Sequence, residues 1–200
     1  RHEEHKEKID ALEKEKDEIK SRMTGYQTLR RDTFLRAYRE INKNFKEVFA
    51  QISDGNGTLV LENEDDPFSG GLTIKANIRD KQNQKLAGMS GGEKSLTALA
   101  FLFAIQKYMP SPFYALDEVD MNLDNPNVER IAKIIMKQAK TAQFIVISLR
   151  QPMLDNAERL LAVSQKEKGV TKILGGIKGN KVTASWFDPG SNLQSTKLFL

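Results

Sequence analysis

The sequence predicts an α/β protein in which one long N-terminal helix precedes a lobe of mixed strands and helices. Residues 1 to about 50 are rich in Lys, Arg and Glu and contain no proline, and their apolar residues recur at the three-four spacing of a coiled-coil helix. Beyond them, short apolar or alternating runs, which predict strands, interchange with apolar runs of helical period. We therefore place a helical arm at 1–52 and a lobe at 53–200.

The arm carries an apolar stripe along its length, with Lys16 filling one position of the seam. A solvated surface helix would show a similar stripe, but the heavily charged remainder of the arm favours a coiled coil. The partner helix of that coiled coil is not found in this sequence. The apolar positions are Ile9, Leu12, Ile19, Met23 and Tyr26 and, after a shift, Tyr38, Ile41, Phe45, Phe49 and Ile52.

Two strands are expected after the arm. Residues 54–57, Asp-Gly-Asn-Gly, end the helix, and residues 58–62 form the first strand. A turn over residues 64–71 leads to Leu72–Ile78, where apolar and polar residues alternate as in a half-buried strand. We expect residues 79–89 to form a polar loop.

A serine followed by a glycine pair, Ser90-Gly91-Gly92, opens an apolar helix that includes Leu96–Ile105. A helix N-terminus offers unpaired N–H groups and the positive end of the helix dipole, and it therefore attracts phosphate. Glycines let the backbone approach a ligand without a Cβ atom in the way. Such a loop can also be an ordinary turn, so by itself it does not identify a phosphate site.

Two adjacent carboxylates, Asp117 and Glu118, end the next strand. Pro110-Ser111-Pro112 stops the helix, and Phe113–Leu116 predicts a short buried strand. Acidic side chains at the end of an apolar strand are costly unless they have partners. An oxygen ligand there suits Mg²⁺, and a neighbouring carboxylate can orient or deprotonate a water. A capped strand end with solvated acids is the alternative.

The remainder of the lobe continues the same alternation of helices and strands. Residues 127–139 carry apolar side chains at helical spacing, with Asn125 or Asn127 as the cap and Pro126 near the first turn. Lys181–Phe187 is either an added edge strand or no part of the fold. The other expected elements are a buried strand at Phe144–Ile147, a short helix at 152–159, and strands at Leu160–Val163 and Val170–Leu174 joined by a hairpin turn at 166–169.

The order of these motifs resembles the C-terminal half of an SMC (structural maintenance of chromosomes) ATPase head of prokaryotic or archaeal type. SMC proteins are a branch of the ABC ATPases, and the resemblance covers 57–172 together with the coiled coil. Met89 replaces the usual leucine, and Leu149 stands where many ABC ATPases have a histidine. The matching segments are the signature motif Ser90-Gly91-Gly92-Glu93, the Walker B strand 113–118, the D-loop Asn122-Leu123-Asp124 and the switch segment 144–150.

The resemblance implies a role for each site residue. Asp117 would hold Mg²⁺, and Glu118 would polarise the water that attacks the γ-phosphate of ATP. Asp124 would help to couple two nucleotide sites, and Ser148 is a candidate in the switch segment. The signature residues Ser90, Gly91, Gly92 and Glu93 would act in trans, on ATP that is held by a second head.

The sequence contains no Gly-x-x-x-x-Gly-Lys-Ser/Thr, the loop that cradles a triphosphate. The resemblance implies that this Walker A loop lies in the N-terminal half of the same head, whose arm would run antiparallel to residues 1–52. It also implies a second SMC head, a kleisin subunit and DNA as partners, with a function in chromosome condensation, segregation or cohesion. A related coiled-coil ABC ATPase of double-strand-break repair, or a mainly structural head with little hydrolysis, would share these motifs.

Composition narrows the class of protein. The 200 residues contain no cysteine, which excludes disulfides and thiolate metal sites. The apolar run at 96–105 is too short to span a bilayer. The net charge of +4 permits contact with nucleic acid without requiring it. We expect no membrane partner and a cytoplasmic, nucleoid-associated location.

Overall fold

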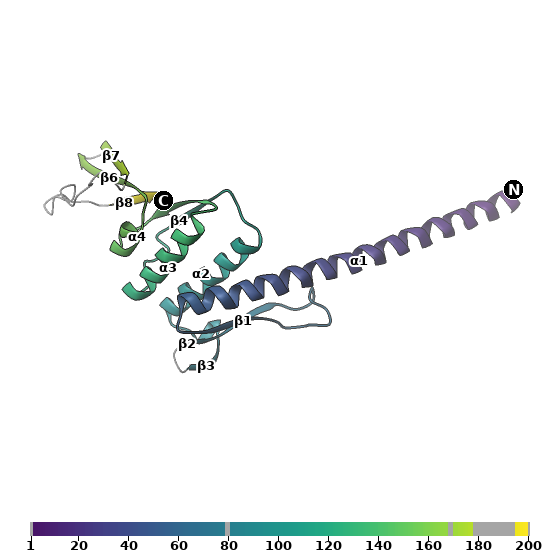
Figure 1. Ribbon diagram of the computed structural model, residues 1–200. Coiled ribbons are helices and arrows are strands. Elements are labelled where there is room, and N and C mark those ends of the chain that lie inside the picture. The colour runs from purple at the N-terminus through teal and green to yellow at the C-terminus, as the bar shows by residue number, and fades with distance from the viewer. Residues whose placement is uncertain (1, 79–80, 168–169, 178–194, 200) are drawn as a thin grey trace.

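The computed structural model describes residues 2–78, 81–167, 170–177 and 195–199. Its most prominent element is α1 (His2–Ile52), a helix of 51 residues whose N-terminal part projects away from the lobe while its C-terminal part packs against it (Figure 1). Along the projecting part, the apolar seam is uncovered, and Leu12 is 64% exposed. Near the other end, Phe45, Phe49 and Ile52 are fully buried. The stripe predicted from the sequence therefore has a packed end and an exposed end.

A three-stranded antiparallel sheet lies beside the packed end of α1. Its strands are β1 (Gly55–Leu61), β2 (Leu72–Ile78) and β3 (Lys81–Lys85), in that spatial order. The polar loop expected at 79–89 was wrong, because β3 and the short 3₁₀ helix η1 (Leu86–Gly88) occupy most of it. β3 is polar in sequence, and pairing with β2 through the backbone gives it strand structure without an apolar face.

Close packing joins this sheet to α1. A Cβ atom on Gly57 would lie 2.7 Å from a ring carbon of Phe45 and 2.8 Å from one of Phe49, so only glycine fits this position of β1. The Tyr38 hydroxyl donates to the carbonyl oxygen of Leu59 at 2.8 Å, and the Leu59 N–H donates to the Asn42 side chain at 2.9 Å. These contacts fix the root of the arm on the lobe.

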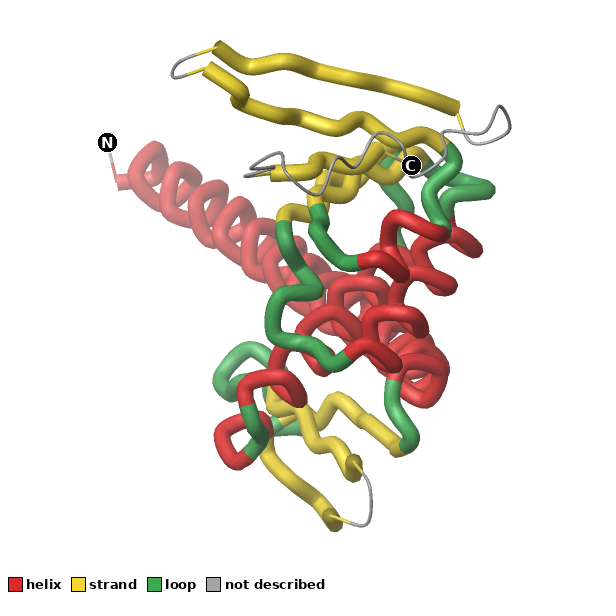
Figure 2. The backbone as a smooth tube through the Cα atoms, turned by 90° about the vertical axis from the view of Figure 1, so that its left-hand side faces the viewer, coloured by secondary structure: helices red, strands yellow, loops and turns green. Residues whose placement is uncertain are grey.

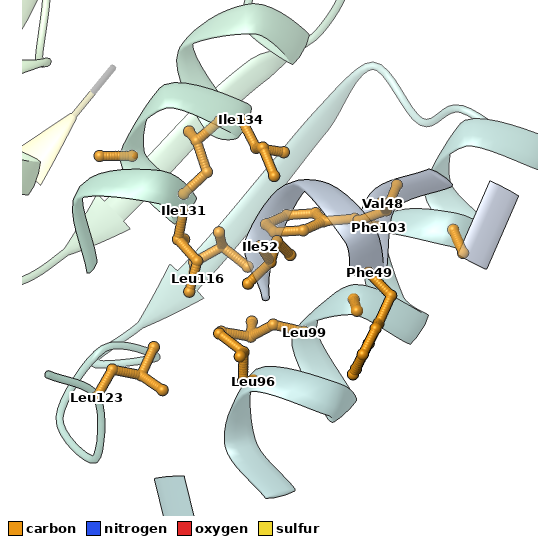
Figure 3. Packing of buried hydrophobic residues seen from close by; sticks show 14 of the residues in the cluster. Val48, Phe49, Ile52, Leu96, Leu99, Phe103, Leu116, Leu123, Ile131 and Ile134 are labelled. Carbon is orange, nitrogen blue, oxygen red and sulfur yellow. The ribbon is translucent and has the colours of Figure 1, made fainter. Parts of the chain in front are cut away.

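The helices α2 (Gly91–Tyr108) and α3 (Asn125–Gln138) complete the core together with α1 and strand β4 (Phe113–Asp117). Leu96, Leu99, Leu116 and Ile131 converge with Ile52 in the close-up of Figure 3. On the outside, the Lys107 ammonium pairs with the Glu47 carboxylate and lowers its pKa. The apolar helix expected after the glycine pair is confirmed as α2.

A second sheet has the strand order β4-β5-β8-β6-β7, and only the β4–β5 pair is parallel. The two sheets lie on opposite sides of the helices (Figure 2). The remaining elements are β5 (Gln143–Ile147), α4 (Gln151–Asp155), β6 (Arg159–Glu167), β7 (Val170–Ile177) and β8 (Ser195–Phe199).

Several expectations for this sheet need correction. β4 is buried on one face only: Leu116 is buried, but Phe113 is 59% exposed, because Phe113, Ala115 and Asp117 share the uncovered face of this strand. β6 continues to Glu167, which pairs with Val170, so residues 166–167 of the expected hairpin turn belong to the strand; 168–169 lie outside the described residues. The proposed edge strand at 181–187 also lies outside them. β8, which enters the sheet between β5 and β6, was not predicted from the sequence. Among the described helices, none has the length and hydropathy of a membrane-spanning segment.

Candidate functional site

Ser90 is the N-cap of α2 and forms a capping box with Glu93. The Glu93 N–H donates to Ser90 Oγ at 3.3 Å, and the Ser90 N–H donates to Glu93 Oε2 at 2.8 Å. The two side chains thus satisfy each other's backbone donors. Gly91 and Gly92 follow in the first helical turn, where N–H groups lack partners within the helix. The Ser-x-x-Glu spacing signals this box, which neither of the two interpretations given above, a phosphate site or an ordinary turn, included.

The signature loop touches the loop that follows β4. A Cβ atom on Gly92 would lie 2.8 Å from the carbonyl oxygen of Asn122, whereas one on Gly91 would meet no atom within 4 Å. The two loops therefore approach as closely as glycine allows at one position. Figure 3 shows Leu123, from the loop after β4, on the same side of the core as Leu96 near the start of α2.

A half-open cavity of about 240 Å³ lies between these loops. Arg130 of α3 bounds it and donates to the Ile52 carbonyl oxygen at 3.2 Å and to Asp54 Oδ2 at 2.9 Å. These bonds attach the last residues of α1 to the helix that follows Asp124. The lining residues are Ser53, Asp54, Ser90, Gly92, Glu93, Leu96, Asn122, Leu123, Asp124, Asn127 and Arg130.

Asp117 and Glu118 lie exposed at the carboxyl end of β4. Glu118 has a φ of 48°, in the left-handed region, which costs an L-residue about 1–2 kcal/mol. Its N–H donates to the carbonyl oxygen of Ile147 at 2.9 Å, and its own carbonyl accepts from the Met121 N–H at 3.2 Å. Strain that the surroundings hold in place is typical of functional positions, and no pattern in the sequence predicts it.

Asp117 suits a magnesium ion that is shared with a nucleotide. Mg²⁺ commonly takes one or two carboxylates and completes its octahedron with water and phosphate oxygens. Within the described residues, no three His, Cys, Asp or Glu side chains are grouped to hold a metal ion. The exposed Asp117 carboxylate at a strand end therefore fits a site in which water and phosphate oxygens complete the coordination of Mg²⁺, and it does not fit a site made of protein ligands alone.

Ser148 is fully buried at the end of β5, and its hydroxyl donates to Oδ2 of Asp120, which is 1% exposed. The N–H of Arg150 donates to Ser148 Oγ at 3.0 Å. The hydroxyl that the sequence suggested for the switch segment is thus engaged inside the lobe. Sequence reasoning assigned Asp120 no role, although it lies two residues after Glu118.

Asp124 is the N-cap of α3, and its Oδ1 accepts the Asn127 N–H at 3.1 Å. The expected cap, Asn125 or Asn127, was therefore wrong, because Asp124 has the extended backbone of a cap and helix α3 already begins at Asn125. The Arg150 guanidinium donates to Asn125 Oδ1. The start of α3 is thereby attached to the segment after β5.

Comparison with known proteins places these features in a family context. Residues 2–172 match the family described as RecF/RecN/SMC N terminal domain. The chromosome partition protein Smc of a Synechococcus species is 52% identical over 173 residues, which are 86% of this chain and 14% of that protein. Smc of Pyrococcus furiosus is 46% identical over 170 residues, which are 84% of this chain and 14% of that protein. The chain thus spans about 14% of the length of these curated relatives.

Two solved structures are similar. The Smc head domain with an extended coiled coil, bound to the C-terminal domain of ScpA and derived from Pyrococcus furiosus, is 45% identical with a TM-score of 0.80; the match covers 86% of this chain and 43% of that one. A chain from a study of ATP-driven dimerization and DNA stimulated activation of SMC ATPases is 47% identical with a TM-score of 0.68. This match covers 73% of the present chain and 89% of the solved one. Since the matching family is described as an N terminal domain, these findings do not bear out the C-terminal-half assignment.

Proposed function

The chain belongs to the RecF/RecN/SMC family, as a part of an SMC ATPase head, and from that premise we propose that it supplies one half of a composite ATP-hydrolysing site in a chromosome-partition protein. The observation that carries this proposal is the contact of Gly92 with the Asn122 carbonyl. It brings the signature loop against the loop that begins at Glu118, so the residues proposed to act on the head's own nucleotide and those proposed to act on the nucleotide of a second head lie close together in one lobe.

In this proposal, Asp117 binds the Mg²⁺ of Mg-ATP, and Glu118 orients and polarises the attacking water. The bound Mg²⁺ would neutralise charge on the phosphates. Phosphoryl transfer depends mainly on positioning and electrostatic stabilisation, which a fixed carboxylate pair can supply. The left-handed backbone of Glu118 separates its side chain from the run of β4, so the two carboxylates can serve different roles.

The signature residues act on ATP bound to a second head. Ser90 Oγ is an acceptor in the capping box, so its proton remains to donate to a phosphate oxygen. Gly91 and Gly92 supply N–H groups at the positive end of α2, and Asp124 lies at the same cavity. Glu93 holds the loop in shape through the Ser90 N–H.

The triphosphate-binding loop comes from another part of the head. The open edge of β4 supports a covering partner half, because Phe113 at the start of this strand is 59% exposed. From the motifs present, we assign the chain to the C-terminal half. Finding the triphosphate-binding loop downstream of these residues in the longer protein, and not upstream, would contradict that assignment.

In this proposal, residues 1–52 are the coiled-coil arm of the head, and residues 53–200 are the lobe. The exposed seam of α1 supports an antiparallel partner helix from the other half. Since one relative was solved with a domain of ScpA and another studied with DNA, we propose a kleisin and DNA as further partners, with the head in the cytoplasm at the nucleoid. ATP-driven engagement and release of two heads would then drive chromosome partition.

Two substitutions test the division of roles in the complete head. Glu118→Gln keeps the shape of the side chain and removes its charge, so hydrolysis should fall by about 10²–10⁴-fold while ATP binding and head engagement persist. Asp117→Asn should weaken the binding of Mg²⁺, and this should reduce both head engagement and ATP turnover. ATPase rates and ATP-dependent dimerisation measure the contrast. Near-normal hydrolysis by Glu118→Gln, or equal loss of engagement in both variants, would contradict the assignment.

A further inference from the structure

Asp120 is a buried carboxylate to which the roles proposed above give no function. It is 1% exposed, and it accepts the hydroxyl proton of Ser148, which is fully buried. Burying a carboxylate is unfavourable unless hydrogen bonds compensate for the lost water. Its retention beside the proposed catalytic turn calls for a role that a packed apolar residue would not fill.

The two hydrogen bonds of Ser148 Oγ have a definite direction, because the hydroxyl accepts one and donates the other. The Arg150 N–H donates to Ser148 Oγ at 3.0 Å, so this oxygen is an acceptor on one side. A serine hydroxyl has one proton, and here it points to Asp120 Oδ2. The chain of bonds therefore runs from the Arg150 amide through Ser148 to Asp120, and a charged acceptor at its end makes the last bond the strong one.

This bond and a backbone bond attach the turn containing Glu118 to the end of β5 and to the residue that follows it. The Glu118 N–H donates to the carbonyl oxygen of Ile147 at 2.9 Å, and Asp120 bonds the adjacent residue, Ser148. Between the two anchors, Glu118 keeps its φ of 48°. A strained residue persists where its surroundings over-determine it, and two bonds to the adjacent residues Ile147 and Ser148 do so.

The same segment reaches the loop that touches the signature motif. Arg150, which bonds Ser148 through its backbone, donates from its guanidinium to Asn125 Oδ1. Asn125 follows Asp124, the cap of α3. One short stretch of chain after β5 thus holds both the Glu118 turn and the start of α3.

We propose that Asp120, through its buried hydrogen bond with Ser148, is a positioning residue that holds the turn presenting Glu118. The inference rests on the proposed function, since the consequence for turnover requires that Glu118 act on water. Misplacing a catalytic group by about 1 Å can cost on the order of 10²-fold in rate. Loss of the bond should lower kcat and leave ATP binding unchanged, because neither side chain reaches the surface.

The test is a double-mutant cycle in the complete head with Asp120→Asn, Ser148→Ala and the pair. Each single variant should lower kcat by roughly 10–100-fold with the KM for ATP within about threefold. The pair should be no slower than the worse single variant, because Asp120→Asn removes the charge of the acceptor and Ser148→Ala removes the donor of the same bond. Ile135→Val is the matched control: it removes one methylene from a fully buried site outside this network, and kcat should stay within about twofold.

Hydrogen exchange in a peptide covering 117–121 gives a readout that does not depend on ATP hydrolysis. Exchange should accelerate in both single variants and stay unchanged in Ile135→Val. Unchanged exchange in the single variants overturns the inference. In an active head, single variants that keep their kcat also overturn it, and so does a double variant whose loss of kcat is the product of the two single losses. If the unaltered head hydrolyses no ATP, the proposed function fails, and exchange alone decides the inference. If Asp120→Asn does not fold, Ser148→Ala, which removes a single oxygen atom, decides it.

Discussion

Replacing Gly92 by alanine should separate the signature loop from the loop after β4. The added Cβ would start 2.8 Å from the Asn122 carbonyl oxygen, and reaching an ordinary contact of 3.4 Å requires a shift of about 0.6 Å. The atom it meets is backbone, which cannot rotate away as a side chain can. Overpacking of this kind costs about 1–3 kcal/mol, and the helical preference of alanine over glycine returns about 0.5–1 kcal/mol.

The net expectation for Gly92→Ala is a loss of about 1 kcal/mol, and of at most about 2.5 kcal/mol, in the free energy of unfolding. Gly91→Ala is the matched control, because a Cβ at that position meets nothing within 4 Å. It should leave stability unchanged or raise it by up to about 1 kcal/mol. Denaturant unfolding of the complete head measures both. Equal stabilities of the two variants would refute the close approach of Gly92 to Asn122.

The remaining predictions concern the interface, the nucleotide and pH. Ser90→Arg should preserve ATP binding by the complete head and abolish its ATP-dependent dimerisation, and an ATP-dependent dimer in sizing chromatography would place Ser90 elsewhere. The chain alone should bind Mg-ATP weakly in calorimetry, since it lacks the triphosphate-cradling loop, and tight binding would contradict the composite site. Lys107 lowers the pKa of Glu47 below its ordinary 4.5, so the pair stabilises the fold above that pH and the contribution is lost as pH falls through the lowered value. Glu47→Gln should therefore flatten the acid limb of thermal stability measured from about pH 6 to about pH 3, and superimposable profiles would count against the pair.

The sequence predicted the elements whose periodicity is local. Helix α2 follows from its apolar run and helix α3 from Val128, Ile131 and Ile135 at helical spacing, all of which are buried. Strand β2 occurs with the bounds expected, Leu72–Ile78, and of its alternating apolar residues Ala76 is buried whereas Leu72 is 44% exposed.

The errors have causes that a single sequence does not display. β3 is a strand only because β2 offers it a backbone edge, and its polar residues carry no strand pattern. The exposure of one face of β4 depends on which elements cover the sheet, which topology and not composition decides. β8 pairs with strands far from it in sequence, and no short-range signal marks such a contact.

The candidate site divides in the same way. Motif order alone located Ser90, Asp117, Glu118 and Asp124. The backbone strain at Glu118 and the burial of Asp120 against Ser148 depend on the packing of the end of β4 against the end of β5. Asp120 and Ser148 are 28 residues apart in the sequence, so their contact is seen only in the folded lobe.

The most direct test of the composite site is an ATPase measurement on this chain, on the half that carries the triphosphate-binding loop, and on their mixture, each with and without DNA. The account predicts negligible hydrolysis by either half and hydrolysis by the mixture that DNA stimulates and Glu118→Gln suppresses by about 10²–10⁴-fold. Hydrolysis by the partner half alone at the rate of the mixture would contradict it, because this chain would then contribute nothing to the chemistry.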